Sequence, residues 1–285
     1  MFLVSLNQKL RALKWFENKK IVEPNIFTFL DLVCLGTVCD VVPLLGLNRA
    51  IVSQGLKVLK KRSNLGIKTL YDLCGINAEP NTYHLGYVLG PRINAGGRLG
   101  KSSHGAELLT SNDPQKAYSL ATDLNTYNDK RKQIESSVTI KADKKAQKRL
   151  KDPILFLDSD DWHEGVIGIV ASRIKERYGK PAIIVSSNGE IGKGSARSIF
   201  GFDIGSHILA AKQSKILISG GGHKMAGGFS IEMKKMDEFK NFLFERYSRL
   251  EFIDNYIKNL YLDSTIYPSA LNEDFYKKIF TLAPF

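Results

Sequence analysis

The stretch ILFLDSDDWHEGVIGIVASRIKERYGKPAIIVSS, residues 154–187, contains the pattern that decides the fold. Its first five residues, four of them apolar and the fifth Asp158, predict a short buried strand. Residues 165–179 predict a helix that ends at Gly179, a typical C-cap residue. A second apolar run in residues 180–187 predicts another strand. Strand, helix and strand in this order predict an α/β unit with parallel pairing.

The segments on either side extend this pattern. Residues 216–232 place a glycine-rich loop between two predicted strands, and residues 236–250 predict an amphipathic helix. On the other side, SNDP (111–114) is a helix start signal, with Asp113 as N-cap and Pro114 at the first helical position. No Gly or Pro follows until after Leu150, which predicts a helix of roughly 35 residues and about 50 Å. A helix of this length is typical of a connector between two domains.

The remaining segments are predicted to be mostly helical, with one loop. Helices are expected over residues 1–20, 26–35 and about 48–61, and residues 83–105, which include GPRINAGGRLGKSSHG, are expected to form a glycine-rich loop. In the tail, NLYLDSTI (259–266) resembles a strand and EDFYKKIFTL (273–282) a helix.

Length and charge limit the possible functions. A chain of 285 residues is long enough for two domains with separate cores. The formal net charge is +12, and residues 129–151 contain nine Lys or Arg against three Asp or Glu, so half of the excess lies there. Such a stripe indicates either a polyanionic partner such as nucleic acid or a solvated helix face.

The three cysteines, Cys34, Cys39 and Cys74, have no CxxC spacing and do not indicate a disulfide framework. No apolar run approaches the roughly 20 residues of a membrane span, and the N-terminus lacks the features of a signal peptide. We therefore expect small buried thiols, no membrane and a cytoplasmic location.

Two glycine-rich stretches carry groups that suit phosphate. GSARS (194–198) places the Ser195 hydroxyl and the Arg197 guanidinium after two glycines, although a plain turn has the same composition. SGGGHKMAGG (219–228) surrounds His223 with five glycines, which indicates that another group approaches the backbone closely. His223 suits a phosphate contact or a proton transfer.

The first 105 residues carry two further features. Asp40 lies in the apolar stretch LGTVCDVVPLLG (35–46), where an ionised carboxylate needs a partner or solvent. GPRINAGGRLGKS (90–102) holds Arg92, Asn94 and Arg98, and its end nearly matches a nucleotide-binding P-loop. The required first glycine is Ala95, and no apolar strand runs into the motif, which disfavours a P-loop.

Five stretches together resemble the RecJ family of single-strand-specific exonucleases in the DHH phosphoesterase superfamily. They occur in the family's order and are LGTVCDVVPL (35–44), GPRINAGGR (90–98), HEGVIGIVASRI (163–174), GSARS (194–198) and SGGGHKMAGG (219–228). The resemblance covers almost the whole chain. It implies an α/β fold made of four parts: the remnant of a DHH domain at 1–105, a long basic connector helix at 106–151, a DHH-associated α/β domain at 152–250 and the start of an OB domain at 251–285.

The resemblance also implies an activity. RecJ proteins remove nucleotides from the 5′ end of single-stranded DNA by metal-dependent phosphodiester hydrolysis, in DNA repair and recombination, with manganese or magnesium. Carried over by position, Asp40 is a metal ligand and His223 is the catalytic histidine that faces the scissile phosphate. The implied phosphate contacts are Arg98, Ser195, Arg197, Arg92 and Asn94.

The sequence departs from the family pattern at its beginning. The family's Asp-x-Asp pair, its further Asp and its Asp-His-His triplet are not found, and the first residues resemble the helix that follows that triplet. Gly96 and Gly227 stand where Ala is usual. One carboxylate does not hold two hard cations, since such sites use several oxygen ligands. We therefore expect a piece of a RecJ protein that is inactive alone, whether from a split gene, a decayed gene or an engineered fragment.

The expected partners are single-stranded DNA and a separately encoded N-terminal half, and the sequence indicates no oligomeric state. Two other functions remain open at this point. One is a non-catalytic single-stranded nucleic-acid-binding module that keeps the phosphate contacts without the chemistry. The other, less favoured, is a P-loop nucleotide hydrolase that binds ATP at Gly100–Ser102.

Overall fold

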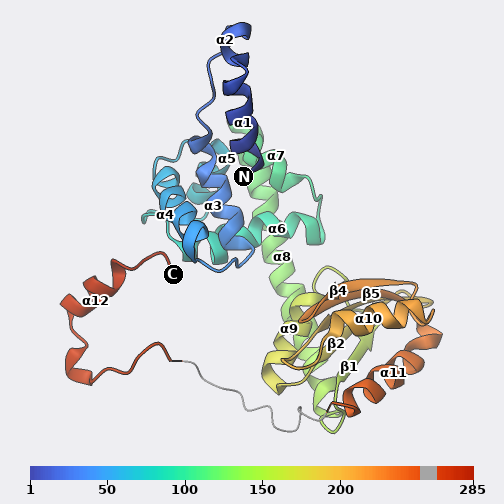
Figure 1. Cartoon of the computed structure of the whole chain (residues 1–285). Coiled ribbons are helices and arrows are strands. Elements are labelled where there is room, and N and C mark those ends of the chain that lie inside the picture. The colour runs from blue at the N-terminus through green and yellow to red at the C-terminus, as the bar shows by residue number, and fades with distance from the viewer. Residues whose placement is uncertain (251–261) are drawn as a thin grey trace. The chain divides into compact units, whose positions relative to one another are not determined.

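The computed structural model describes residues 1–250 and 262–285, which divide into two compact units (Figure 1). Unit 1 comprises Met1–Tyr127 and Ser264–Phe285, and unit 2 comprises Asn128–Asp263. Helix α8, Pro114–Gln147, begins in unit 1 and ends in unit 2. Its 34 residues confirm the predicted long helix, and Asp113 caps it by accepting a hydrogen bond from the Gln115 N–H at 2.9 Å.

Unit 1 is helical in all of its described regular elements. These are α1 (Phe2–Ala12), α2 (Trp15–Lys19), η1 (Ile26–Phe29), α3 (Leu30–Cys39), α4 (Gly46–Lys60), α5 (Leu65–Leu73), the π-helical turn η2 (His84–Leu89), α6 (Gly90–Leu99), α7 (His104–Thr110), η5 (Pro268–Ala270) and α12 (Glu273–Phe280). One hydrophobic core joins α3, α4, α5, η2, α7 and the first part of α8. Of the three cysteines expected to be buried, Cys34 is buried, whereas Cys39 and Cys74 are half-buried.

The expected glycine-rich loop over residues 83–105 is wrong for its central part, which is η2 followed by α6. The glycines there serve close packing. A Cβ on Gly90 would lie 2.5 Å from Sγ of Cys39, so only glycine lets this helix start approach α3. Pro91 occupies the first turn of α6, where its missing N–H costs no helical hydrogen bond. Local composition alone therefore gave the wrong element.

Unit 2 is an α/β domain built on one sheet, which among the described residues has five strands in the order β1-β2-β3-β5-β4. The strands are β1 (Leu155–Ser159), β2 (Ala182–Ser187), β3 (Ile191–Arg197), β4 (Ser219–His223) and β5 (Ala226–Glu232). β1 and β2 are parallel, as predicted, and the other neighbours are antiparallel. Helix α9, Ile167–Tyr178, connects β1 to β2 and ends at Gly179, whose φ of 64° fits the predicted C-cap.

Helices cover the two faces of this sheet differently (Figure 1). On one face, α10 (Ile204–Gln213) and α11 (Met236–Ser248) form a core with apolar side chains from the strands. On the other face, α9 and the second half of α8 pack on the apolar side chains of β1 and β2. The part of this second face that belongs to β3, β5 and β4 carries no residue of that core. Ser195 and Arg197, two of the predicted phosphate-binding residues, lie there.

The tail is described only from residue 262. The predicted strand over 259–266 falls partly outside the described residues, and residues 262–266 have no regular structure. The predicted helix is present as α12. The start of an OB domain at 251–285 stays a prediction. Within residues 1–250 and 262–285, no helix combines the length and the apolar character that a membrane crossing requires.

Candidate functional site

The first part of the candidate site is the pair Ser195 and Arg197 on β3. Residues two apart on a strand face the same side, and Nη1 of Arg197 donates a hydrogen bond to Oγ of Ser195 at 3.2 Å. The same Nη1 donates to the carbonyl oxygen of Ala196 at 2.9 Å, and Nε donates to Oγ of Ser172 on α9 at 3.2 Å. The half-buried guanidinium is therefore held by the strand on one side and by α9 on the other.

The start of α9 lies directly against this pair. A Cβ on Gly168 would lie 3.2 Å from Nη2 of Arg197 and 3.2 Å from Oγ of Ser195. The N-terminal turn of a helix has a partial positive charge and attracts anions. A helix start, a guanidinium and a hydroxyl thus meet at one place, an arrangement that suits a phosphate group.

His223 belongs to the same face of the sheet. Arg197 on β3 and His223 on β4 both pair with Ala226 of the intervening β5, so the three residues form one row. Directly opposed residues of antiparallel strands point to the same face, and two strand spacings separate Arg197 from His223 by about 10 Å. Nδ1 of His223 accepts the Met225 N–H at 3.3 Å, so a neutral ring carries its proton on Nε2.

The neighbouring row supplies an open floor. Ser195 pairs with Gly228, which pairs with Gly221. A Cβ on Gly221 would meet no atom within 4 Å, and one on Gly228 would meet only the Gly194 carbonyl oxygen at 3.8 Å. Alternate glycines of the same strands point the other way and pack on α10, as Gly227 does. The glycines therefore have two roles. Those that face α10 let the helix pack closely on the sheet, and those on the other face leave open space above the backbone.

Arg92, Asn94 and Arg98 lie on α6 in unit 1. Nε of the half-buried Arg92 donates to Oδ1 of Asn125 on α8 at 2.8 Å, and Nη1 donates to the Val88 carbonyl oxygen at 2.8 Å. Arg92 therefore fastens α6 to α8. Asn94 and Arg98 are exposed and four residues apart, so they share one face of the helix. Their contact with substrate stays a prediction.

Asp40 is the C-cap of α3 and is exposed, so solvent provides the partner that its sequence context requires. The Val41 N–H donates to the Val38 carbonyl and the Val42 N–H to the Thr37 carbonyl, which is the Schellman arrangement. Val41 occupies its left-handed position with a φ of 54°, where glycine is usual and a β-branched residue is strained. The chain thus turns sharply just after Asp40.

The donor set around Asp40 does not fit a complete metal site. No group of three or more His, Cys, Asp or Glu side chains able to hold a metal occurs in the described parts of the chain. The other carboxylate of α3, Asp31, is at the opposite end of the helix, about 13 Å away along its axis. Cys39 is a poor ligand because burial, and then the nearby Asp40 carboxylate, raise the pKa of its thiol to about 11.

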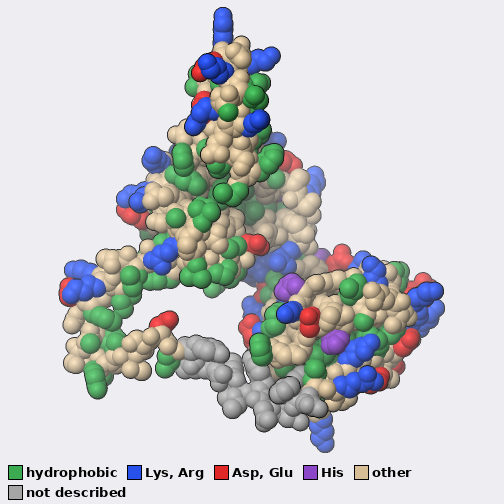
Figure 2. Space-filling model, viewed as in Figure 1, with side chains coloured by type: hydrophobic (Ala, Val, Ile, Leu, Met, Phe, Trp, Pro, Cys, Tyr) green, Lys and Arg blue, Asp and Glu red, His purple; other side chains and the backbone are tan. Residues whose placement is uncertain are grey.

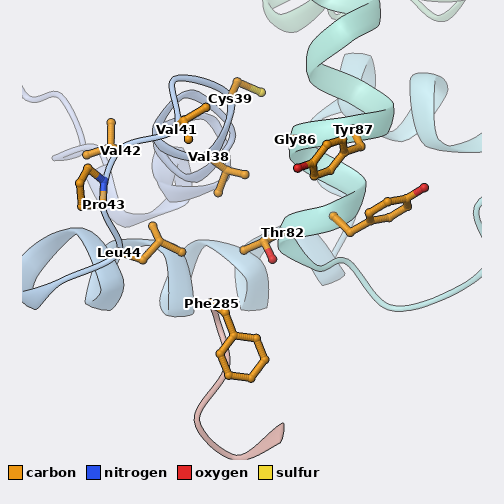
Figure 3. A pocket seen from close by; sticks show the side chains of 11 residues that line it. Val38, Cys39, Val41, Val42, Pro43, Leu44, Thr82, Gly86, Tyr87 and Phe285 are labelled. Atoms are coloured by element: carbon orange, nitrogen blue, oxygen red, sulfur yellow. The ribbon is translucent and has the colours of Figure 1, made fainter. Parts of the chain in front are cut away.

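A pocket of about 490 Å³ lies in unit 1, and its lining includes Cys39 and Val41, the sequence neighbours of Asp40 (Figure 3). Val38, Val41 and Pro43 line it together with Tyr83 and Tyr87. The two tyrosine rings are stacked, with centroids 5.4 Å apart. Hydrophobic side chains also cover much of the visible surface of unit 1 (Figure 2). The pocket has the character of an apolar contact surface, and no charged side chain lines it.

The near-match to a P-loop does not form one. Gly100, Lys101 and Ser102 follow the helix α6, whereas a P-loop follows a strand. A Cβ on Gly100 would lie 2.4 Å from the Tyr127 ring, so this glycine is used for packing. The structure gives no support to an ATP site here.

The sequence reasoning missed several residues of the site on unit 2. Gly168 and Ser172 were assigned only to a helix, yet their spacing of four places both on one face of α9, against Arg197. Lys193 was also missed, although it lies two residues before Ser195 and its Nζ donates to Oγ of Ser230 at 3.1 Å. A turn and a short strand are predicted over residues 189–198, and the alternation of β3 (Ile191–Arg197) places Lys193 on the same face as Ser195.

Comparisons with known proteins identify relatives of this chain and of its second unit. Residues 151–249 match the family model described as the DHHA1 domain. The single-stranded-DNA-specific exonuclease RecJ of Dickeya dadantii is 39% identical over 84% of this chain and 43% of its own length. The RecJ of Haemophilus influenzae is 40% identical over the same shares. The chain thus spans less than half the length of these curated relatives.

Solved structures give the same result for the fold. The crystal structure of RecJ in complex with Mg²⁺ from Thermus thermophilus matches with a TM-score of 0.70 and 30% identity, over 82% of this chain and 36% of that one. A structure of exonuclease RecJ bound to manganese matches with a TM-score of 0.68 and 29% identity, over 82% and 58%. The expected α/β fold with a DHH-associated domain is confirmed.

Proposed function

This chain is a RecJ homologue with a DHHA1 domain at residues 151–249, and we propose that it forms the phosphate-binding part of a single-stranded-DNA-specific 5′-to-3′ exonuclease. One observation carries the proposal. Arg197, Ser195 and His223 face the open, glycine-floored part of the sheet at the start of α9. This arrangement offers positive charge and several donors to a phosphate, and the backbone floor lets it approach closely.

Each group has a distinct part in binding. Arg197 presents a planar fork that matches two phosphate oxygens. Ser195 adds a hydroxyl donor beside it, and the His223 ring, whose Nδ1 accepts the Met225 N–H, offers Nε2 on the other side of the floor. All three contact phosphate and not base edges, so binding would be insensitive to base sequence.

The basic segment 129–151 supports the proposal only in part. Several of its charges are used inside unit 2, where Arg131 pairs with the buried Glu135 and Lys141 pairs with Asp161. Both interpretations of the segment therefore apply: some residues stabilise the domain, and the remaining positive charge favours a polyanion. The predicted DNA track along α8 is kept as part of the proposal.

Hydrolysis needs more than these residues. In the proposed enzyme, Asp40 would be one ligand of a manganese or magnesium ion, and such an ion would activate water and stabilise charge on the scissile phosphate. Because the described residues group no further ligands around Asp40, we place the rest of the metal site, and the cleavage that contributes to DNA repair and recombination, on residues beyond those that the structure describes.

Binding tests the proposal directly. Fluorescence anisotropy would measure the affinity of the full chain for single-stranded DNA with and without a 5′-phosphate. Arg197→Ala should weaken binding about 10-fold or more, the value of a charge-assisted hydrogen bond. Arg249→Ala is the matched control, because Arg249 is exposed and pairs with Glu245 on α11. Equal affinity of wild type and Arg197→Ala would refute the phosphate site. A preference for 5′ over 3′ ends would favour the exonuclease over a general binding module.

A further inference from the structure

A second polar row crosses the sheet face that holds the phosphate site. Strand pairing connects Ser159 to Ser186, Ser186 to Lys193, Lys193 to Ser230, and Ser230 to Ser219. We call these five residues the serine–lysine row. Their side chains point to the same face as Ser195 and Arg197, because Lys193 precedes that pair by two and four residues on β3. Four hydroxyls and one ammonium group thus cross all strands of the described sheet.

Only one end of the row is accessible. Ser159 donates to Oδ1 of Asp161 at 2.7 Å, and Ser186 donates to the Trp162 carbonyl, so these two hydroxyls hold the loop after β1. Lys193 and Ser219, by contrast, are exposed, and the buried Ser230 lies between them. Nζ of Lys193 leans across the sheet to Oγ of Ser230. On the open side of the sheet, the ammonium group of Lys193 is therefore followed by the Ser230 hydroxyl on β5 and the Ser219 hydroxyl on β4.

The row lies along the sheet from the phosphate site. Each step of two residues on a strand covers about 6.8 Å, so the row of Lys193 is about 7 Å from the row of Ser195 and about 14 Å from that of Arg197. Gly221 and Gly228, which share the row of Ser195, leave open space between the Lys193 row and the Arg197 row. A chain of phosphates held at Arg197 and laid along β5 would pass over the glycine floor and reach Lys193.

Charge near the row favours an anion. The nearest carboxylate along the same face of β5, Glu232, forms an ion pair with Lys234 at 2.7 Å. Asp161, at the far end, pairs with Lys141. Lysine serves phosphate as a point charge, and serine hydroxyls add neutral donors. The ammonium and hydroxyl groups of the accessible end match a phosphodiester, and the exposed Ile191 lies two residues from Lys193 on the same face.

We propose that Lys193, with Ser219 and Ser230, forms a second phosphate subsite, which binds an internal phosphodiester of the single strand whose other phosphate is held at Arg197. This inference rests on the proposed function and gives it a direction: the strand follows β3 and β5 from the Arg197 row toward the Lys193 row. A strand too short to span both rows does not use the second subsite.

The experiment compares ligands of two lengths on the full chain. Thymidine 5′-monophosphate occupies one subsite only, whereas a 5′-phosphorylated decathymidylate reaches both. Lys193→Ala should leave the affinity for the monophosphate within about twofold, and lower that for the decathymidylate about 3- to 10-fold at low salt. It should also reduce the slope of log affinity against log salt by about 0.7, the value for one phosphate contact on a single strand. Lys193→Arg should retain both the affinity for the decathymidylate and the salt slope of the wild type.

Matched variants separate the possible failures. Lys212→Ala removes an exposed lysine from α10, on the other face of the sheet, and should change neither affinity nor salt slope. If Lys193→Ala behaves like Lys212→Ala with the decathymidylate, the second subsite is refuted. If it weakens both ligands equally, Lys193 belongs to the Arg197 site and a separate subsite is refuted. If Arg197→Ala binds both ligands with the affinity of the wild type, the proposed function itself is refuted.

Discussion

Arg197 and Ser172 are joined by a hydrogen bond of 3.2 Å from Nε to Oγ, although one lies on β3 and the other on α9. The position of Ser172 is fixed because two contacts hold α9 against α8. Arg173 forms an ion pair with Glu135, and Oη of Tyr178 donates a 2.7 Å hydrogen bond to Asp143. The long helix thus sets the position of α9, and α9 sets the plane of the guanidinium.

We expect Ser172→Ala to weaken binding of 5′-phosphorylated single-stranded DNA about 3- to 10-fold, since the guanidinium loses one orienting hydrogen bond. Ser172→Thr keeps the hydroxyl and should bind like wild type. Ser214→Ala, at the exposed end of α10, is the control. Anisotropy titrations measure all four proteins, and an unchanged affinity of Ser172→Ala would show that the bond has no part in binding.

Glu135 should dominate the stability of unit 2. Its carboxylate is 3% exposed and pairs with Arg131 and Arg173. Glu135→Ala leaves a mostly buried Arg131 without its counter-charge, which should lower the free energy of unfolding by about 3 kcal/mol in urea titrations. Glu245→Ala breaks an exposed pair on α11 and should cost at most about 0.5 kcal/mol. Similar losses in both variants would contradict the buried network.

The strained turn after Asp40 predicts a stabilising substitution. Val41 is 86% exposed and has a φ of 54°, so replacing it with glycine removes strain and little packing. Val41→Gly should raise the free energy of unfolding by about 0.5 to 1 kcal/mol, after allowing for the greater freedom of the unfolded chain. Val33→Gly, inside α3, should instead lower it by about 0.5 kcal/mol. The same sign in both variants would exclude the left-handed conformation.

His207 makes stability depend on pH. Burial lowers its pKa from the usual value, and the nearby Arg246 lowers it further, while Asp203 acts in the opposite direction. Below about pH 6.5 the unfolded chain therefore binds a proton that the folded chain resists. The free energy of unfolding should fall as the pH falls from about 6.5 through the lowered pKa. Urea titrations of wild type and His207→Gln should diverge in this window, and parallel curves would contradict the shift.

Purified chain with manganese and 5′-phosphorylated single-stranded DNA should release no nucleotides, because one carboxylate gives too few oxygen ligands for a hard cation. Gel electrophoresis of labelled DNA measures this. Degradation that Asp40→Ala abolishes would show that the chain completes a metal site. Degradation that persists in Asp40→Ala would indicate a contaminating nuclease.

The secondary structure could be predicted from sequence wherever the signal is local. The N-cap at Asp113, the C-cap at Gly179 and the parallel pair around α9 follow from residues close in the chain. The helix α6 could not, because its glycines and proline are typical of loops and only the packing of Gly90 on Cys39 explains them.

The candidate site shows the same division. The sequence alone determined which groups can bind phosphate, because Ser195, Arg197 and His223 carry their donors wherever they are placed. Only the tertiary structure decided that Arg197 and His223 share a row, that Ser172 orients the guanidinium, and that Lys193 meets Ser230. The physical reason is that strand pairing joins residues distant in sequence, and a register shift of one residue would turn a strand's side chains to the opposite face.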